Sequence, residues 1–221
     1  MIEEILQKEN EGLGDIKTDD CVGFDHYDAT ADIIFESRNF SSYKPLASKI
    51  FELFPNAKNI LELGCGAGVL SHHYRNLNPE ITYVTLDINK DVRGNNVVKD
   101  EHHFICFTDR EFQIQQDGSQ MKFDLILSFE HFEHIPNENI SIFLENIKKH
   151  CHVDTIVIAT AALWAGTDGR HPLILDLSGW TQLLSDNGFE VINDTHSFLS
   201  TTSIPYNFEL HNSVELIFKL K

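Results

Sequence analysis

The sequence is short of positive charge. Its 221 residues include 17 Lys and Arg against 34 Asp and Glu, which gives a formal net charge of −17. A surface of this kind repels the phosphate backbone of nucleic acids, and the sequence shows no local basic patch that would offset the repulsion. We therefore expect no nucleic-acid partner.

Cysteine pairs and long apolar runs are also missing. The four cysteines form no C-x-x-C pair, which excludes a disulfide framework and suits reduced thiols in a cytosol. No stretch approaches the ~18 apolar residues of a membrane span, and the amino terminus lacks the basic region and apolar run of a secretory signal. We expect a cytoplasmic protein with no membrane partner.

What the chain does have is enough apolar material for one α/β domain. Its hydrophobic content is 42%, which suits a single sizeable core in a chain of this length. We expect an acidic tail, held loosely or as a helix, and lid helices over residues 1–44, followed by one domain over residues 45–221. Apolar spacing and capping residues predict helices that end before Pro55 and that span residues 71–77, 141–149 and 178–187.

The most informative stretch is residues 60–68, Ile-Leu-Glu-Leu-Gly-Cys-Gly-Ala-Gly, which reads as a buried strand, a glycine-rich turn and the start of a helix. Glycines at alternate positions allow positive φ and let a ligand lie against bare main chain. The dinucleotide fingerprint G-x-G-x-x-G is not met, because Val69 stands where its third glycine would be. The turn therefore indicates a nucleotide-cofactor loop and argues against a nucleotide-dependent oxidoreductase.

More buried strands follow this turn. Residues 83–88 predict a second strand that ends in Asp87, roughly 20 residues past the glycines, where a carboxylate can accept both ribose hydroxyls. Apolar runs predict further strands over residues 104–107, 123–128 and 155–160, with an antiparallel hairpin from residues 190–197 and 213–219. Residues 115–119 predict a turn.

The chain resembles the class I S-adenosylmethionine-dependent methyltransferases in four features that occur in the same order along the sequence. These are the motif Glu-Leu-Gly-Cys-Gly-Ala-Gly, the acid at position 87, the segment 129–136 and the pair Gly188-Phe189. The resemblance covers about residues 45–221. It implies a Rossmann-like α/β fold with a mostly parallel seven-stranded sheet, helices on both faces and a C-terminal antiparallel hairpin. It also implies that S-adenosylmethionine is the cofactor.

The resemblance assigns cofactor contacts to the strand ends. Gly64, Gly66 and Gly68 would allow close approach of the methionyl part, and Asp87 would hold the ribose hydroxyls. The other predicted contacts are Tyr27, which would close over the cofactor with Tyr43, and Glu62, Cys65, Ile88, Ser128 and Phe129.

In this family an acid after the third strand commonly holds the adenine amino group, and two aspartates compete for that role. Asp109 directly follows the apolar run 104–107, so we assign it. Asp100 is the alternative, but it would require a third strand at Val97-Val98 and a long insertion before Phe123.

The segment Glu130-His131-Phe132-Glu133-His134 invites a metal hypothesis, because its two histidines are three residues apart with carboxylates beside them. The family resemblance favours another role, in which Glu133 and His134 support the loop by hydrogen bonds, and we therefore predict no metal. His131 departs from the usual apolar residue and would place a near-neutral imidazole close to the methyl group. It is a candidate general base.

The loop of residues 161–172 is the candidate acceptor loop, because ligands of open α/β sheets bind beyond the carboxyl ends of the strands. Trp164 would stack on a planar or sugar-like acceptor, Arg170 would pair with an acidic group, and His171 would bind the acceptor or act as a base. We expect the part of this loop from Trp164 to Pro172 to face His131.

These patterns predict an enzyme that moves a methyl group from S-adenosylmethionine to oxygen or nitrogen of a small molecule, a sugar or a specialised metabolite. Two alternatives share the same cofactor half: a methyltransferase acting on protein or tRNA, and a module that binds S-adenosylmethionine without turnover.

Overall fold

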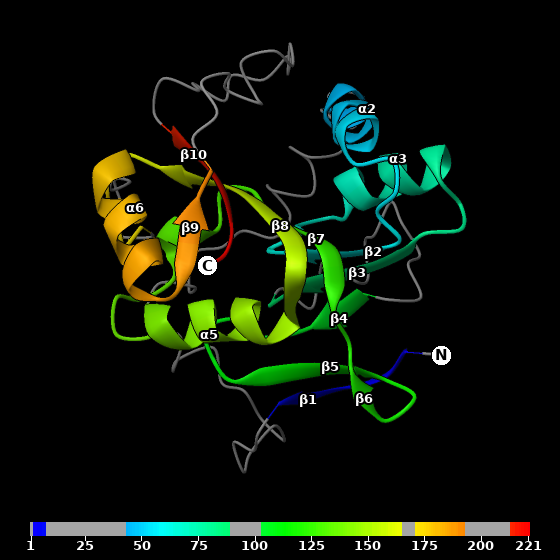
Figure 1. Ribbon diagram of the computed structural model, residues 1–221, viewed down its shortest axis with the longest axis horizontal. Coiled ribbons are helices and arrows are strands. Elements are labelled where there is room, and N and C mark those ends of the chain that lie inside the picture. Colours follow the sequence, from blue (N-terminus) through cyan, green and yellow to red (C-terminus); the bar gives the residue numbers. More distant parts are fainter. Residues whose placement is uncertain (1, 8–42, 89–102, 165–170, 193–212) are drawn as a thin grey trace.

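The computed structural model describes residues 2–7, 43–88, 103–164, 171–192 and 213–221, which form a seven-stranded sheet with helices on both faces and a separate three-stranded sheet (Figure 1). In spatial order, the strands of the large sheet are β4 (His103–Ile105), β3 (Thr82–Asp87), β2 (Asn59–Leu63), β7 (Phe123–Ser128), β8 (Cys151–Ala162), β10 (Ser213–Leu220) and β9 (Phe189–Val191).

The predicted Rossmann-like α/β fold is confirmed. Strands β4, β3, β2, β7 and β8 are parallel, and β10 runs antiparallel to both β8 and β9. The β9–β10 pair is the expected C-terminal hairpin. Because the five parallel strands share one direction, their carboxyl ends meet along one edge of the sheet, where such folds bind their ligands.

Helices cover both faces of the sheet (Figure 1). On one face lie α2 (Tyr43–Leu53) and α3 (Val69–Leu77), and on the other lie α5 (Ile140–His150) and α6 (Leu177–Asp186). All four match predicted helices to within two residues at their described ends. Within the described ranges, no helix has the length and apolar character to cross a membrane.

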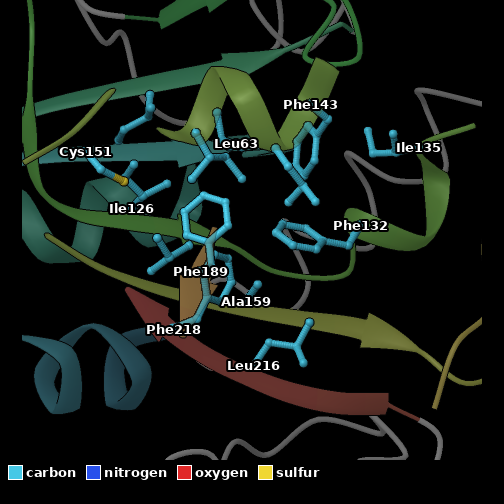
Figure 2. Close-up of a cluster of buried hydrophobic side chains, with 14 of the residues drawn as sticks. Leu63, Ile126, Phe132, Ile135, Phe143, Cys151, Ala159, Phe189, Leu216 and Phe218 are labelled. Carbon is cyan, nitrogen blue, oxygen red and sulfur yellow. The ribbon is translucent and has the colours of Figure 1, made fainter. Parts of the chain in front are cut away.

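Alternation along the strands explains the two cores. Leu61, Leu63 and Ile126 face α5 and α6 in a core that also holds Phe132 and Phe143 (Figure 2). Their neighbours along the same strands, which include Ile60, Leu125 and Leu127, face α2 and α3. Strands β2 and β7 are therefore buried on both sides, which accounts for their almost continuous apolar sequences.

The small sheet corrects two expectations. The acidic start of the chain was expected as a helix or tail, but β1 (Ile2–Gln7) pairs antiparallel with β5 (Phe112–Gln116). The turn expected over residues 115–119 is narrower, because β6 (Ser119–Gln120) pairs with the end of β5. Asp117 and Gly118, with φ of 52° and 72°, make a two-residue hairpin turn of the kind that needs left-handed backbone.

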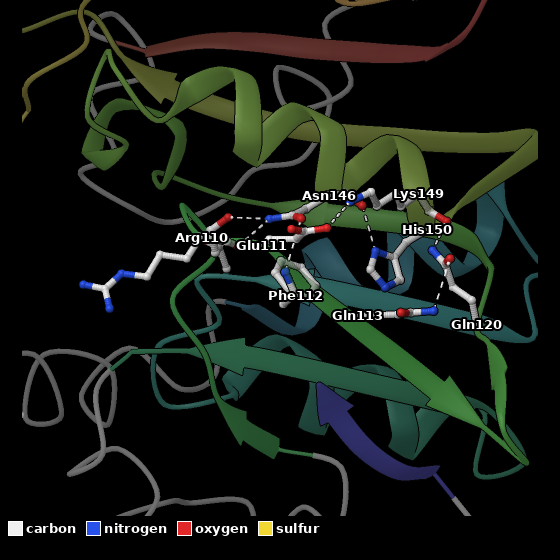
Figure 3. Close-up of polar contacts among 9 residues, drawn as sticks. Arg110, Glu111, Phe112, Gln113, Gln120, Asn146, Lys149 and His150 are labelled. Carbon is white, nitrogen blue, oxygen red and sulfur yellow. Dashed lines mark hydrogen bonds and ion pairs between the residues drawn. The ribbon is translucent and has the colours of Figure 1, made fainter. Parts of the chain in front are cut away.

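A polar network fastens β5 to α5 (Figure 3). The amide of Ile114 donates to His150 Nε2 at 3.0 Å, and His150 Nδ1 lies 2.7 Å from the carbonyl oxygen of Asn146. Since a carbonyl only accepts, Nδ1 carries the proton and the ring is neutral. Burial lowers the pKa of His150 to about 4. Asn146 in turn accepts from the Phe112 amide at 3.4 Å and donates to the carbonyl of Thr108 at 3.1 Å.

Candidate active site

The glycine turn between β2 and α3 has the left-handed backbone that the sequence predicted. Gly64, Gly66 and Gly68 have φ of 68°, 52° and 70°. The amides of Gly64 and Cys65 donate to the carbonyl oxygen of Leu86 at 2.9 and 3.1 Å, so the turn is tied to the end of β3. The helix α3 begins directly after Gly68, which aims its amino-terminal N–H groups at the same region.

Asp87 lies against this turn. Its Oδ2 accepts a hydrogen bond from the amide of Gly66 at 2.9 Å, and its carbonyl oxygen accepts from Cys106 at 2.9 Å. The predicted ribose acid and the predicted methionyl loop are therefore held together at adjacent strand ends. Ile88 follows Asp87 and is half-buried.

Glu62 is buried two residues before the turn. Tyr83 Oη donates to Glu62 Oε2 at 2.9 Å, and both side chains lie on the sheet face that α2 and α3 cover. Burial, followed by the Glu62 charge and hydrogen bond, raises the pKa of Tyr83 well above its usual value. This contact fixes the carboxylate at the base of the loop, and its contact with a cofactor stays a prediction.

Gly64 has a second reason to be glycine. A Cβ at this position would lie 2.5 Å from both Cγ and Nδ1 of His131, so the missing side chain makes room for that ring. The close approach of a cofactor to Gly64 stays a prediction, and the ring of His131 lies in the space that a side chain at Gly64 would take.

His131 is held between the glycine turn and Thr108. Its Nε2 lies 2.8 Å from Thr108 Oγ1. Burial, with a smaller contribution from His134, lowers the pKa of His131 to about 3, so the ring is neutral at pH 7 and binds a proton weakly. Its surroundings favour a positioning role over the predicted role as general base.

Other predicted cofactor contacts flank the turn. Ser128 is fully buried at the end of β7, and its Oγ donates to the carbonyl oxygen of Leu63 at 3.2 Å. Phe129 is partly buried and packs against the core beneath α2 and α3. Ser128 therefore joins β7 to β2 directly below the glycine turn.

Asp109 follows β4 as predicted for the adenine acid. Its Oδ2 accepts from Asn139 Nδ2 at 2.9 Å, and Asn139 is the residue before α5. The alternative, Asp100, lies outside the described residues, as do the predicted cofactor residue Tyr27 and the predicted substrate residue Arg170.

The acceptor loop brings His171 to a different partner from the one expected. Its ring centroid lies 4.7 Å from that of His134 and 4.9 Å from that of Trp164, and its Nδ1 lies 2.7 Å from the Trp164 carbonyl oxygen. His131, which we expected to face this loop, instead contacts Gly64 and Thr108. Trp164 is half exposed, as a stacking residue would be.

Two buried carboxylates beside this loop were not predicted as a feature of the site. Glu130 has φ of 51°, and its Oε2 accepts from Ser213 Oγ at 3.0 Å. Glu133 was expected to support the loop by hydrogen bonds. The backbone amides of Glu133 and Ala162 lie close enough to its carboxylate to favour the charged form, but within the described part of the chain neither carboxylate oxygen has a hydrogen-bond partner of ordinary geometry. Burial, then repulsion from Glu130, raises the pKa of Glu133 to about 8. The E-x-x-E spacing was the only sequence signal for this pair.

The parallel sheet, the left-handed glycine turn and the acid at the next strand end together define a Rossmann-like nucleotide-cofactor enzyme. A family model described as "Methyltransferase domain" matches residues 35–204. Because this match covers most of the sequence, the chain belongs to the methyltransferase domain family. The predicted enzyme class is confirmed, and with it S-adenosylmethionine as the methyl donor.

Solved structures support the fold. The chain is similar to an S-adenosylmethionine-dependent methyltransferase from Clostridium acetobutylicum ATCC 824, at 13% identity and a TM-score of 0.60, over 80% of this chain and 92% of that one. The plantazolicin methyltransferase BpumL, solved with S-adenosylhomocysteine (SAH), gives 12% identity and a TM-score of 0.62 over 87% and 90%. The glycopeptide N-methyltransferase MtfA gives 13% and 0.58 over 80% and 94%. No curated protein matches the sequence.

Proposed function

We propose that the protein transfers a methyl group from S-adenosylmethionine to oxygen or nitrogen of a small molecule, a sugar or a specialised metabolite. One observation carries the proposal: the hydrogen bond from the Gly66 amide to Asp87 Oδ2 joins a glycine turn and an acid at neighbouring strand ends. The turn offers bare main chain to an amino-acid tail, and the acid offers acceptors to a ribose.

The residues at hand fit this cofactor. S-adenosylmethionine, when bound, supplies an activated methyl group on a sulfonium. The chain's part is to align donor and acceptor and to exclude water. Gly66 and Gly68 would lie beneath the methionyl part, Asp87 would accept from the ribose hydroxyls, and Asp109 would accept from the adenine amino group. The ring of His131 packs against Gly64 and so supports the backbone of the glycine turn.

The acceptor side is the loop that follows β8. Trp164 offers an exposed aromatic face, and His171 beside it offers a polar contact. Arg170 would pair with an acidic group of the acceptor. The acidic surface argues against a tRNA acceptor. Two of the similar structures are a plantazolicin methyltransferase and a glycopeptide N-methyltransferase, which supports a small or peptide-like acceptor.

Of the two predicted bases, His171 is better placed to move a proton. Because its Nδ1 donates to the Trp164 carbonyl, its Nε2 is the nitrogen with the free lone pair in the neutral ring. His131 has its Nε2 on Thr108 and a depressed pKa, so its predicted catalytic role is less favoured.

Calorimetric titration tests the cofactor site. SAH should bind in the micromolar range and NAD far more weakly. Binding of NAD without binding of SAH would overturn the proposal. Once SAH binding is established, methylation assays with sugars, natural-product scaffolds, basic proteins and tRNA distinguish a small-molecule acceptor from a protein or tRNA acceptor. Methylation of protein or tRNA alone, or tight SAH binding with no turnover of any acceptor, would replace the small-molecule assignment.

A further inference from the structure

We propose that Glu133, His134 and His171 form a binding site for a divalent transition-metal ion beside the acceptor loop. One ligand atom from each of the three residues lies within 4.8 Å of the other two. Ligands at the ~2.1 Å bonds of zinc are about 3.4 Å apart in a tetrahedral site, so shifts of about 1 Å would bring the set into coordination. The inference rests on the proposed function only for its catalytic consequence.

The buried carboxylate of Glu133 is the strongest indication that this cluster binds a cation. Glu133 is 1% exposed, and in the described ranges neither of its oxygens has a hydrogen-bond partner of ordinary geometry. A buried carboxylate is normally paired, hydrogen-bonded or bound to metal. Nearby Glu130 also has one buried oxygen, Oε1, without a partner among the described residues. A dication bound by Glu133 would also offset the repulsion between these two carboxylates.

The histidines are arranged as ligands. The hydrogen bond from His171 Nδ1 to the Trp164 carbonyl fixes the tautomer and leaves Nε2 with its lone pair. Metal-binding histidines characteristically donate their other N–H to a carbonyl or carboxylate in this way. His134 lies on the same short turn as Glu133, in the 3₁₀ helix η3 (Phe132–His134), and its ring is edge-on to that of His171.

The backbone holds the two segments together. The amide of Leu173, two residues after His171, donates to the carbonyl oxygen of Glu133 at 3.3 Å. The set of one carboxylate and two imidazoles suits zinc, iron(II), manganese or cobalt better than magnesium or calcium, which prefer oxygen ligands. It also differs from the histidine pair, His131 and His134, that the sequence pattern suggested.

The position gives the ion a role in the proposed reaction. It lies beyond the carboxyl ends of β7 and β8, where the acceptor would enter. A hydroxyl bound to the ion would lose its proton to solvent more readily. Its oxygen would then form a bond to the methyl carbon as the carbon–sulfur bond breaks, which leaves neutral SAH. His171 would act as a ligand rather than as the base.

Metal binding can be tested without activity. We would strip the full chain with EDTA, remove the chelator, and titrate with Zn²⁺ by calorimetry and with Co²⁺ by visible absorption. The expected result is one tight equivalent and a Co²⁺ spectrum typical of nitrogen and oxygen ligands. Glu133→Gln and His171→Ala should each weaken Zn²⁺ binding at least tenfold. His72→Ala, on the exposed side of α3, is the matched control and should leave this equivalent unchanged.

Thermal unfolding adds a readout that separates binding from misfolding. Without metal, Glu133→Gln should be at least as stable as the wild type, because it replaces a buried carboxyl group that has no hydrogen-bond partner of ordinary geometry among the described residues by an uncharged amide of the same shape. With Zn²⁺, the melting temperature should rise for the wild type and not for this variant. Equal Zn²⁺ binding by wild type and Glu133→Gln, or no tight equivalent in the wild type, would overturn the site. SAH titrated into the same samples keeps the two proposals apart, because SAH binding without Zn²⁺ binding refutes only the metal site.

Discussion

Replacing Gly64 by Ala tests whether the glycine turn is built around His131. A left-handed conformation costs a residue with a Cβ about 1–2 kcal/mol, and Gly64 has φ of 68°. The new Cβ would also lie 2.5 Å from two ring atoms of His131, and overpacking of this kind costs about 1–3 kcal/mol. We expect Gly64→Ala to lower the free energy of unfolding by roughly 2–5 kcal/mol.

Gly118 provides a matched control. Its φ is 72°, close to that of Gly64, but a Cβ there would meet nothing within 4 Å. Gly118→Ala should therefore show only the backbone contribution, about 1–2 kcal/mol. The difference between the two variants, measured by urea unfolding at constant m-value, isolates the collision with His131.

A double-mutant cycle identifies the partner. His131→Ala should destabilise the wild type but should destabilise Gly64→Ala less, with a coupling of about 1–3 kcal/mol, because the second substitution removes the collision. Equal losses for Gly64→Ala and Gly118→Ala, or a coupling near zero, would refute the contact. SAH titration of the folded variants then reports whether the displaced turn still binds the cofactor.

Three further predictions concern other residues. Asp87→Ala should weaken SAH binding by roughly 1.5–3 kcal/mol in calorimetry while unfolding stays cooperative, and an unchanged affinity would move the ribose site elsewhere. His150 stays neutral in the folded protein down to about pH 4, whereas its pKa is 6.5 when unfolded, so stability is lost as pH falls between these values. In denaturant melts the wild type should therefore lose about 2 kcal/mol more than His150→Gln between pH 7 and pH 5, and parallel losses would contradict the buried neutral ring. Asp176 caps α6 by accepting from the Gly179 amide at 2.8 Å. Asp176→Ala should lower the free energy of unfolding by about 1 kcal/mol and leave SAH affinity unchanged, and an unaltered urea midpoint would show that the cap contributes nothing.

The sequence predicted the parallel sheet because its strands are buried on both faces and so read as apolar runs, as in Phe123–Ser128. It did not predict β1 or β5, whose sequences Ile-Glu-Glu-Ile-Leu-Gln and Phe-Gln-Ile-Gln-Gln mix polar and apolar residues. These strands pair across more than half of the chain, and no local pattern indicates a partner so far away.

The candidate site also contains residues that the sequence predicted and contacts that it did not. The glycine turn and Asp87 were predictable because close backbone approach and a strand-end acid leave local signatures. The neighbours of His131 and His171 were not, because they are set by which strands lie side by side. Placing β7 next to β2 brings His131 against Gly64, and placing β8 next to β7 brings His171 to His134.

Residues 128–134 serve both halves of the site. Ser128 fastens the end of β7 to β2, His131 fits over Gly64, and the next turn carries Glu133 to the acceptor side. Folding alone does not explain this arrangement. A buried carboxyl group whose oxygens have no hydrogen-bond partner of ordinary geometry destabilises a protein, and an apolar residue of similar size would do so less. Retaining Glu133 where the acceptor enters is therefore explained by what it binds, and the metal-free stability of Glu133→Gln measures the stability given up for that binding.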